Sequence, residues 1–184
     1  MKNINNKPKL IILSDLWGRE KSGWTDSYVE RLQNNYSITC YDCCELGGID
    51  KTSYTEPDLH HQFINGGIER AVINLLANEK EEVSLLAFSI GGVIAWKAAL
   101  LGLKVKSLFA VSSTRLRYET EKPDGRIELY FGENDVHRPS IDWFRTMKIS
   151  SHTLRNESHE LYRKPEFAQM LSEDILKPGV IPKE

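Results

Sequence analysis

The sequence lacks the features that mark membrane proteins and nucleic-acid-binding proteins. No apolar run approaches the ~20 residues that a membrane-spanning helix needs. The formal net charge is −2, which gives no electrostatic basis for attracting nucleic acid. Internal repeats, low-complexity tracts and linkers are also absent from the sequence. We therefore expect no membrane span and no nucleic-acid partner.

Cysteine is scarce, and its placement argues against two further classes of protein. Cys40, Cys43 and Cys44 are an odd and clustered set, which does not suit a disulfide framework. Cys40 and Cys43 form one C-x-x-C pair, and His60 and His61 follow, but this spacing matches no common zinc finger. The thiols are expected to be reduced, and we predict no metal and no cofactor.

The amino terminus lacks a secretory signal. Residues 1–9 are mostly polar, and the apolar run 10–13 is too short for the core of a signal peptide. Together with reduced cysteines, this pattern predicts a cytoplasmic protein. Nothing in the sequence indicates the oligomeric state.

What the sequence does contain is an alternation of apolar strands and helices. Its 184 residues, 40% hydrophobic and 27% charged, suit a single domain over residues 1–184. Apolar runs predict strands at residues 9–14, 37–42, 83–88, 105–111, 127–131 and 149–154. Helical spacing predicts helices at residues 24–34, 59–76, 90–101, 139–147 and 165–176, the last one closed by residues 177–179. This alternation predicts an α/β fold, with about six mostly parallel strands and helices on both faces.

The junction between the third strand and the following helix contains Ser89. Its neighbours are small, with Ala87 two residues before it and Gly91 two residues after it. Small neighbours allow a sharp backbone bend, which holds the serine in an unfavourable conformation at a cost of roughly 1–3 kcal/mol. Such a bend exposes the hydroxyl at the carboxyl end of the sheet, beside the next backbone N–H.

This junction resembles the nucleophile elbow of the α/β-hydrolases, whose pattern is G-x-S-x-G. Ala87 replaces the first glycine, while Gly91 and Gly92 keep the other side. The resemblance extends over residues 9–176. It implies an α/β-hydrolase-type three-layer sandwich without a cap domain, and it assigns Ser89 as the nucleophile.

The same resemblance implies an acid and then a histidine farther along the chain. Asp135 follows the fifth predicted strand, and His159 follows the sixth. A serine hydroxyl needs a base to take its proton, and the base needs a carboxylate to fix its tautomer. The family pattern therefore assigns His159 as the base and Asp135 as its partner, with Glu133 as the competing acid.

The resemblance also places an oxyanion hole, with N–H donors from Ile90 and Leu16. Relatives carry His-Gly-x-x-Gly after the first strand, whereas Ser14 and Asp15 replace the first two residues here. We expect Asp15 to turn away, to hydrogen-bond within its own loop and to hold the Leu16 N–H in place. The alternative is a carboxylate that faces the developing oxyanion and opposes it.

Only about fifteen residues, 112–126, occupy the connection in which the family usually inserts its lid. An open site is therefore predicted, with Tyr162 or Trp143 as further wall residues. The candidate substrate-binding residues are Trp17, Phe88, Arg115 and Tyr118. Arg115 and Arg117 could meet an acidic acyl tail or the phosphate of a carrier, although solvated arginines are the simpler interpretation.

Together these residues predict a small serine hydrolase. It would cleave a carboxylic ester or thioester of a small-molecule or carrier-linked acyl substrate through an acyl-enzyme. The alternative is a catalytically degenerate hydrolase that binds a ligand or partner without turnover. The altered loop at Ser14 and Asp15 is the feature that supports this alternative.

Overall fold

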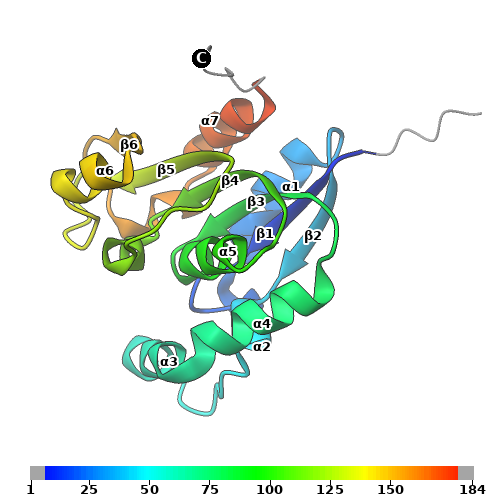
Figure 1. Ribbon diagram of the computed structural model, residues 1–184, viewed down its shortest axis with the longest axis vertical. Coiled ribbons are helices and arrows are strands. Elements are labelled where there is room, and N and C mark those ends of the chain that lie inside the picture. The colour runs from blue at the N-terminus through cyan, green and yellow to red at the C-terminus, as the bar shows by residue number, and fades with distance from the viewer. Residues whose placement is uncertain (1–6, 178–184) are drawn as a thin grey trace, which may run out of the picture.

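The computed structural model describes residues 7–177, which form three layers with a six-stranded sheet in the middle (Figure 1). All neighbouring strands are parallel, in the order β2-β1-β3-β4-β5-β6. The strands are β1 (Lys9–Leu13), β2 (Ser37–Tyr41), β3 (Val83–Phe88), β4 (Val105–Val111), β5 (Arg126–Gly132) and β6 (Ser151–Leu154). The predicted α/β class and the number of strands are confirmed.

Seven α-helices are described, together with short turns of other helix types. The α-helices are α1 (Asp26–Leu32), α2 (Cys43–Gly47), α3 (Glu56–Gln62), α4 (Ile68–Asn78), α5 (Ile90–Leu100), α6 (Ile141–Met147) and α7 (Pro165–Leu176). The short turns are η1 (Arg19–Lys21), η2 (Gly23–Thr25), η3 (Phe63–Gly67), η4 (Thr114–Tyr118) and η5 (His159–Arg163). No helix within residues 7–177 is both long and apolar enough to cross a bilayer.

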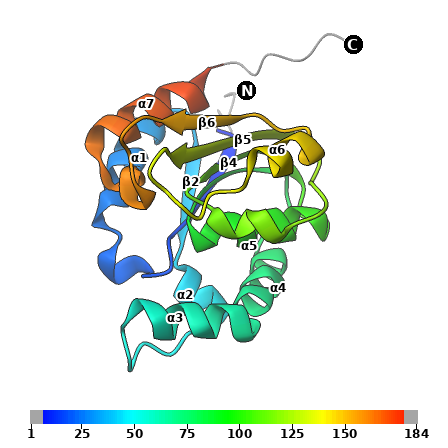
Figure 2. The ribbon, with the colours of Figure 1, turned by 90° about the vertical axis from the view of Figure 1, so that its left-hand side faces the viewer.

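Successive residues of each strand point to opposite faces of the sheet, so the apolar runs feed two separate cores. In β3, Leu85 and Ala87 belong to the core beneath α4 and α5, while Leu86 and Phe88 belong to the core beneath α1 and α7. Figure 2 shows α1 and α7 on one side of the sheet and α4 and α5 on the other. Burial on both faces explains why β3 contains no polar alternation.

The strand order reverses between β1 and β3, because β2 lies beyond β1 while β4 lies beyond β3. In open parallel sheets, ligands bind at the carboxyl ends of the strands near such a reversal. The loop after β1 and the β3–α5 junction leave the sheet at this point. Gly91 keeps the two close together, since a Cβ on it would lie 2.6 Å from the carbonyl oxygen of Ser14.

Most differences from the predicted elements have local causes. The predicted helix over residues 59–76 is interrupted within η3, where Asn65 and Gly66 leave helical backbone angles. The sixth strand begins two residues later than predicted, because Lys148 ends α6 in the left-handed conformation and delays the strand. The predicted closing signal at residues 178 and 179 lies outside the described part of the chain.

The connection between β4 and β5 contains only the short turn η4. The described chain therefore has no cap domain at the position where the sequence predicted none. Helix α3 instead lies opposite η4 across the carboxyl end of the sheet, and both contribute to the pocket described below.

Candidate active site

Ser89 lies at a strained junction between β3 and α5. Its backbone angles are φ 49° and ψ −114°, a region that residues with a Cβ rarely occupy. The Ser89 N–H donates to the carbonyl of Val111 at 2.8 Å, and its own carbonyl accepts from Gly92. These two hydrogen bonds and the buried strand hold the bend, so the half-buried side chain stands at the edge of the sheet.

Ser89 shares a hydrogen-bonded chain with His159 and Asp135, the two partners predicted for it. The Ser89 Oγ lies 2.9 Å from Nε2 of His159, and Nδ1 of His159 lies 2.7 Å from Oδ2 of Asp135. Because Nδ1 faces a carboxylate, it carries the proton in the neutral imidazole. Nε2 is then the acceptor for the serine hydroxyl, as a base must be.

Asp135 is buried, and its surroundings keep it ionised. Burial alone would raise the pKa of this carboxyl, but the hydrogen bond and charge of His159 lower it below its ordinary value. The backbone N–H of His137 adds a further hydrogen bond at 3.2 Å to the other carboxylate oxygen. A carboxylate fixed in this way can orient His159 and stabilise its protonated form.

The loops that carry Asp135 and His159 are joined through their backbones. Gly132 ends β5 without a side chain, and the carbonyls of Glu157 and Ser158 occupy the space that a Cβ would need. The Asn134 N–H donates to the Glu157 carbonyl at 2.8 Å. This close approach sets the spacing between the acid and the histidine.

The two residues predicted to form the oxyanion hole, Ile90 and Leu16, both have backbone N–H groups without an acceptor in the described part of the chain. Ile90 is the first residue of α5, so its N–H has no acceptor within the helix. The Leu16 N–H, in the loop after β1, has no protein acceptor among residues 7–177. Both residues line the same pocket as Ser89. Two donors left free beside a serine hydroxyl can stabilise an oxyanion.

Asp15 turns away from the pocket. Its side chain is 0% exposed, and its Oδ1 accepts the N–H of Trp17 at 3.0 Å within its own loop. Its Oδ2 accepts from the Tyr162 hydroxyl and from Arg163, both at 3.1 Å. The geometry matches the expected orientation and adds two partners that follow His159 in η5.

The buried Asp15 carboxylate is therefore a link between two loops. Burial raises the pKa of Asp15, and the hydrogen bonds and charge of Arg163 work in the opposite direction. The loop that carries the Leu16 N–H is joined in this way to the turn that begins at His159. Sequence reasoning missed Tyr162 and Arg163 as partners, because nothing local indicates a contact 147 residues away.

The thiols of Cys43 and Cys44 also hold the loop that carries Leu16. The Cys43 thiol donates to the Ser14 carbonyl at 3.0 Å, and the Cys44 thiol donates to the Leu16 carbonyl at 3.2 Å. Burial raises the pKa of Cys43 well above its usual value and that of Cys44 to about 12, so both remain thiols at neutral pH. The sequence indicates reduced thiols but not this role.

If Asp15 is a positioning residue, Asp15→Ala is expected to lower kcat for an ester substrate about tenfold and to reduce stability by about 3 kcal/mol. The stability loss follows from leaving the Trp17 N–H, the Tyr162 hydroxyl and the Arg163 guanidinium without the buried carboxylate that accepts their hydrogen bonds. Asp15→Asn keeps an acceptor for the Trp17 N–H, so it should recover most of kcat while remaining less stable.

Initial-rate assays at a saturating ester concentration measure kcat of both variants. Denaturant titrations measure their stability. Asp142→Ala, which removes an exposed carboxylate on α6, is the control and should change neither. A kcat above that of the wild type for Asp15→Asn would mean that the carboxylate opposes the oxyanion.

A pocket of about 690 Å³ opens beside Ser89. Its lining includes the hydrogen-bonded chain and the two candidate oxyanion donors. It also includes the candidate substrate-binding residues Trp17 and Arg115 and the possible wall residue Tyr162. Helix α3 adds Glu56, Pro57 and His60 from the opposite side. No sequence pattern indicates this wall, because the apolar spacing of the helix marks only the face that packs on the core.

Two predicted substrate-binding residues do not line the pocket. Phe88 is 0% exposed, because its position in β3 points it into the core beneath α1 and α7, where it packs against Trp24 and Tyr28. Tyr118 is 60% exposed at the end of η4 and lies outside the pocket lining. Trp143, the other possible wall residue, packs against Trp96 and donates to the Glu119 carbonyl.

Glu133, the competing acid, and His152 contact other residues and not the Ser89–His159–Asp135 chain. Glu133 is exposed and accepts from the backbone N–H of Asn156, not from His159. His152, in β6, stacks on Tyr130 and lies 3.0 Å from a Glu128 oxygen. Within residues 7–177, no group of three or more histidine, cysteine or carboxylate side chains is arranged to hold a metal ion.

No protein-family model matches the chain, and no curated protein matches its sequence. Solved structures do match its fold. A candidate hydrolase of the alpha/beta superfamily from Xanthomonas campestris pv. campestris superposes with a TM-score of 0.64 at 17% identity, over 92% of this chain and 98% of that chain.

Two further matches extend the comparison. Est1E from Butyrivibrio proteoclasticus gives a TM-score of 0.64 at 13% identity, over 95% of this chain and 89% of that chain. A membrane phospholipase A, a bacterial virulence factor, gives a TM-score of 0.63 at 18% identity, over 93% of this chain and 79% of that chain. At these identities the similarity establishes a fold, and the activity has to be argued from the site.

Proposed function

We propose that the chain, which has the α/β-hydrolase fold, is a serine hydrolase that cleaves a carboxylic ester or thioester through an acyl-enzyme. The observation that carries this proposal is the pair of hydrogen bonds from Ser89 to His159 and from His159 to Asp135, at 2.9 and 2.7 Å. The strained backbone of Ser89 and the two free N–H groups beside it support the same function.

The first half of the reaction transfers the acyl group to the protein. The Ser89 oxygen attacks the carbonyl carbon while its proton passes to Nε2 of His159. The carbonyl oxygen gains negative charge, which the N–H groups of Leu16 and Ile90 stabilise. When the bond to the alcohol or thiol breaks, His159 returns the proton to the leaving group and Ser89 carries the acyl group.

The second half releases the acid. A water molecule gives a proton to His159 and attacks the acyl carbon, and the same two N–H groups stabilise the second oxyanion. The bond to the Ser89 oxygen then breaks, and His159 returns the proton to the serine. Asp135 remains ionised throughout and stabilises the positive charge on His159 in both halves.

The open pocket favours an acyl substrate that is either a small molecule or linked to a carrier. Only η4 occupies the connection after β4, and the volume of about 690 Å³ lies within the usual range for small-molecule sites. The degenerate alternative was supported by the altered loop at Ser14 and Asp15. The Asp15 side chain is buried and its oxygens accept three hydrogen bonds from Trp17, Tyr162 and Arg163, which favours turnover over this alternative.

Turnover of two model substrates tests the proposal. The purified protein is expected to hydrolyse p-nitrophenyl butyrate and a butyryl thioester with saturation kinetics. The ratio of kcat/KM for the two decides whether oxygen or sulfur is the better leaving atom. Binding of either compound without hydrolysis above the buffer rate would instead support the degenerate alternative.

A further inference from the structure

Two arginines of η4 approach the pocket from the side opposite α3. Arg115 and Arg117 both line the pocket, and both guanidinium groups contact the ring of Tyr118. Their central carbons lie 5.1 Å and 4.3 Å from the centroid of that ring. The Tyr118 ring thus holds two positive charges close together at the edge of the pocket. Tyr118 itself lies outside the pocket lining.

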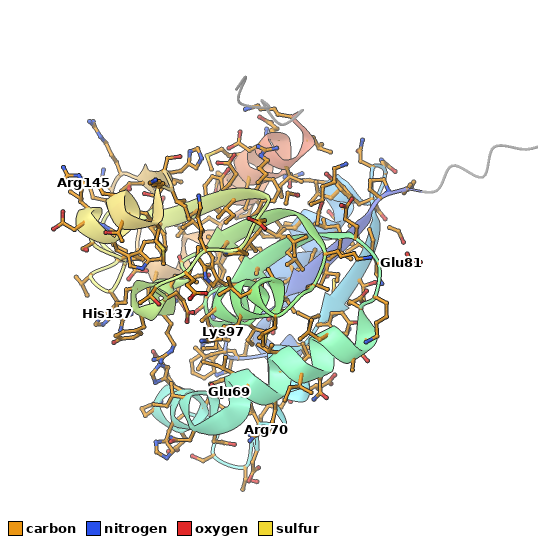
Figure 3. All side chains as sticks on the ribbon, viewed as in Figure 1. Glu69, Arg70, Glu81, Lys97, His137 and Arg145 are labelled. Carbon is orange, nitrogen blue, oxygen red and sulfur yellow. The ribbon has the colours of Figure 1, made fainter. Side chains whose placement is uncertain are left out.

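Arg117 is fixed in position by hydrogen bonds to neutral groups. It donates to the carbonyls of Thr114 and His137 at 2.9 and 3.2 Å, and to the Tyr118 hydroxyl at 2.8 Å. Figure 3 labels His137 near η4, on the loop that follows β5. These contacts hold the guanidinium beside the loop that carries Asp135, but none of them neutralises its charge.

Neither Arg115 nor Arg117 forms an ion pair with a carboxylate within residues 7–177. Two of the three carboxylates that line the pocket already have partners, since Asp135 is bound by His159 and Glu160 by Arg163. The third is the exposed Glu56 on α3. The two arginines therefore leave positive charge facing the pocket.

The positive charge also affects the pKa of His60, which lies on α3 across the pocket. Burial lowers the pKa of His60, and the charges of Arg115 and Arg117 lower it further, while Glu56 acts in the opposite direction. A histidine on a different element is thus affected by both arginines. Two like charges held together without a counter-ion favour the binding of an anion between or beside them.

We propose that Arg115 and Arg117 form an anion subsite of this pocket, which selects acyl substrates that carry a carboxylate or a phosphate away from the bond to be cleaved. This inference rests on the proposed function and adds the substrate class to it. Arginine suits the role because its planar guanidinium can bind either anion with two hydrogen bonds. The Arg115 side chain, which contacts the Tyr118 ring but forms no hydrogen bond to the described protein, is the less constrained member of the pair.

A matched pair of esters tests the subsite. The mono-p-nitrophenyl ester of glutaric acid carries a terminal carboxylate, and p-nitrophenyl pentanoate replaces that carboxylate with a methyl group. We expect the wild type to favour the anionic ester by about tenfold or more in kcat/KM. In Arg115→Gln this ratio should fall about tenfold, chiefly through KM for the anionic ester. Arg145→Gln, which removes an exposed arginine on α6 (labelled in Figure 3), should keep the wild-type ratio.

Inhibition of p-nitrophenyl pentanoate hydrolysis separates the two anions. Glutarate and inorganic phosphate are titrated as competitors against the wild type and Arg115→Gln. Stronger inhibition by glutarate indicates a carboxylate substrate, and stronger inhibition by phosphate indicates a phosphate-bearing one. Either inhibition must weaken in Arg115→Gln.

Failure of this inference differs from failure of the proposed function. If the wild type hydrolyses both esters equally and neither anion inhibits through Arg115, the anion subsite is overturned while the hydrolase remains. If the wild type hydrolyses neither ester, both proposals are overturned.

Discussion

Ser89→Ala is expected to lower kcat/KM for p-nitrophenyl butyrate by about 10⁴-fold or more. In the proposed mechanism the substitution removes the oxygen that forms the acyl bond, and the oxyanion donors and pocket alone leave a small residual rate. Alanine keeps the Cβ and the backbone hydrogen bonds of the junction, so the fold should be unchanged. Initial rates and circular dichroism of both proteins measure the two expectations.

A second buried serine provides the control for this result. Ser172, on α7, is buried, and its hydroxyl has no hydrogen-bond partner among the described residues. Ser172→Ala should therefore keep wild-type kinetics. If Ser89→Ala retained more than a tenth of the wild-type activity, Ser89 would not be the nucleophile.

Asp135→Asn is expected to lower kcat by about 10³- to 10⁴-fold. An amide can direct its NH₂ group at Nδ1 of His159, which then becomes an acceptor and leaves the proton on Nε2. In that tautomer the histidine cannot accept the proton of Ser89. The KM for the ester should change little, because Asp135 acts through the histidine and not on the substrate.

Glu133→Gln is the matched control for the acid. Glu133 lies two residues from Asp135, but its carboxylate accepts from the Asn156 N–H at 3.0 Å, and a glutamine oxygen can accept the same bond. Its kcat should stay close to that of the wild type. If Glu133→Gln were the more damaging change, the role of acid would belong to Glu133.

The central part of the fold could be predicted because local sequence and tertiary structure agree there. Residues 83–88 are apolar at nearly every position, as expected of a strand that is buried on both faces. The structure has β3 at these same residues. Small residues around Ser89 indicated the bend directly. The positions of Asp135 and His159 followed from the ends of later strands, since parallel strands deliver their carboxyl ends to one edge of the sheet.

The remaining features of the site depend on contacts between distant segments. The face of β3 on which Phe88 lies is set by the register of the sheet, so an aromatic residue beside the nucleophile could be either core or wall. The partners of Asp15 come from η5, and the thiols of Cys43 and Cys44 reach the loop after β1 from α2. None of these pairs leaves a periodic or spaced pattern in the sequence.

The central claim is that Ser89 is an activated nucleophile, and a fluorophosphonate probe tests it most directly. Such a probe forms a phosphonyl bond to a serine oxygen only when a base removes its proton and an oxyanion site faces the phosphorus. After incubation and proteolysis, mass spectrometry is expected to find one phosphonyl adduct, on the peptide that contains Ser89, and none in Ser89→Ala. Wild-type protein that stays unlabelled, or that is labelled at a different serine, would contradict the account.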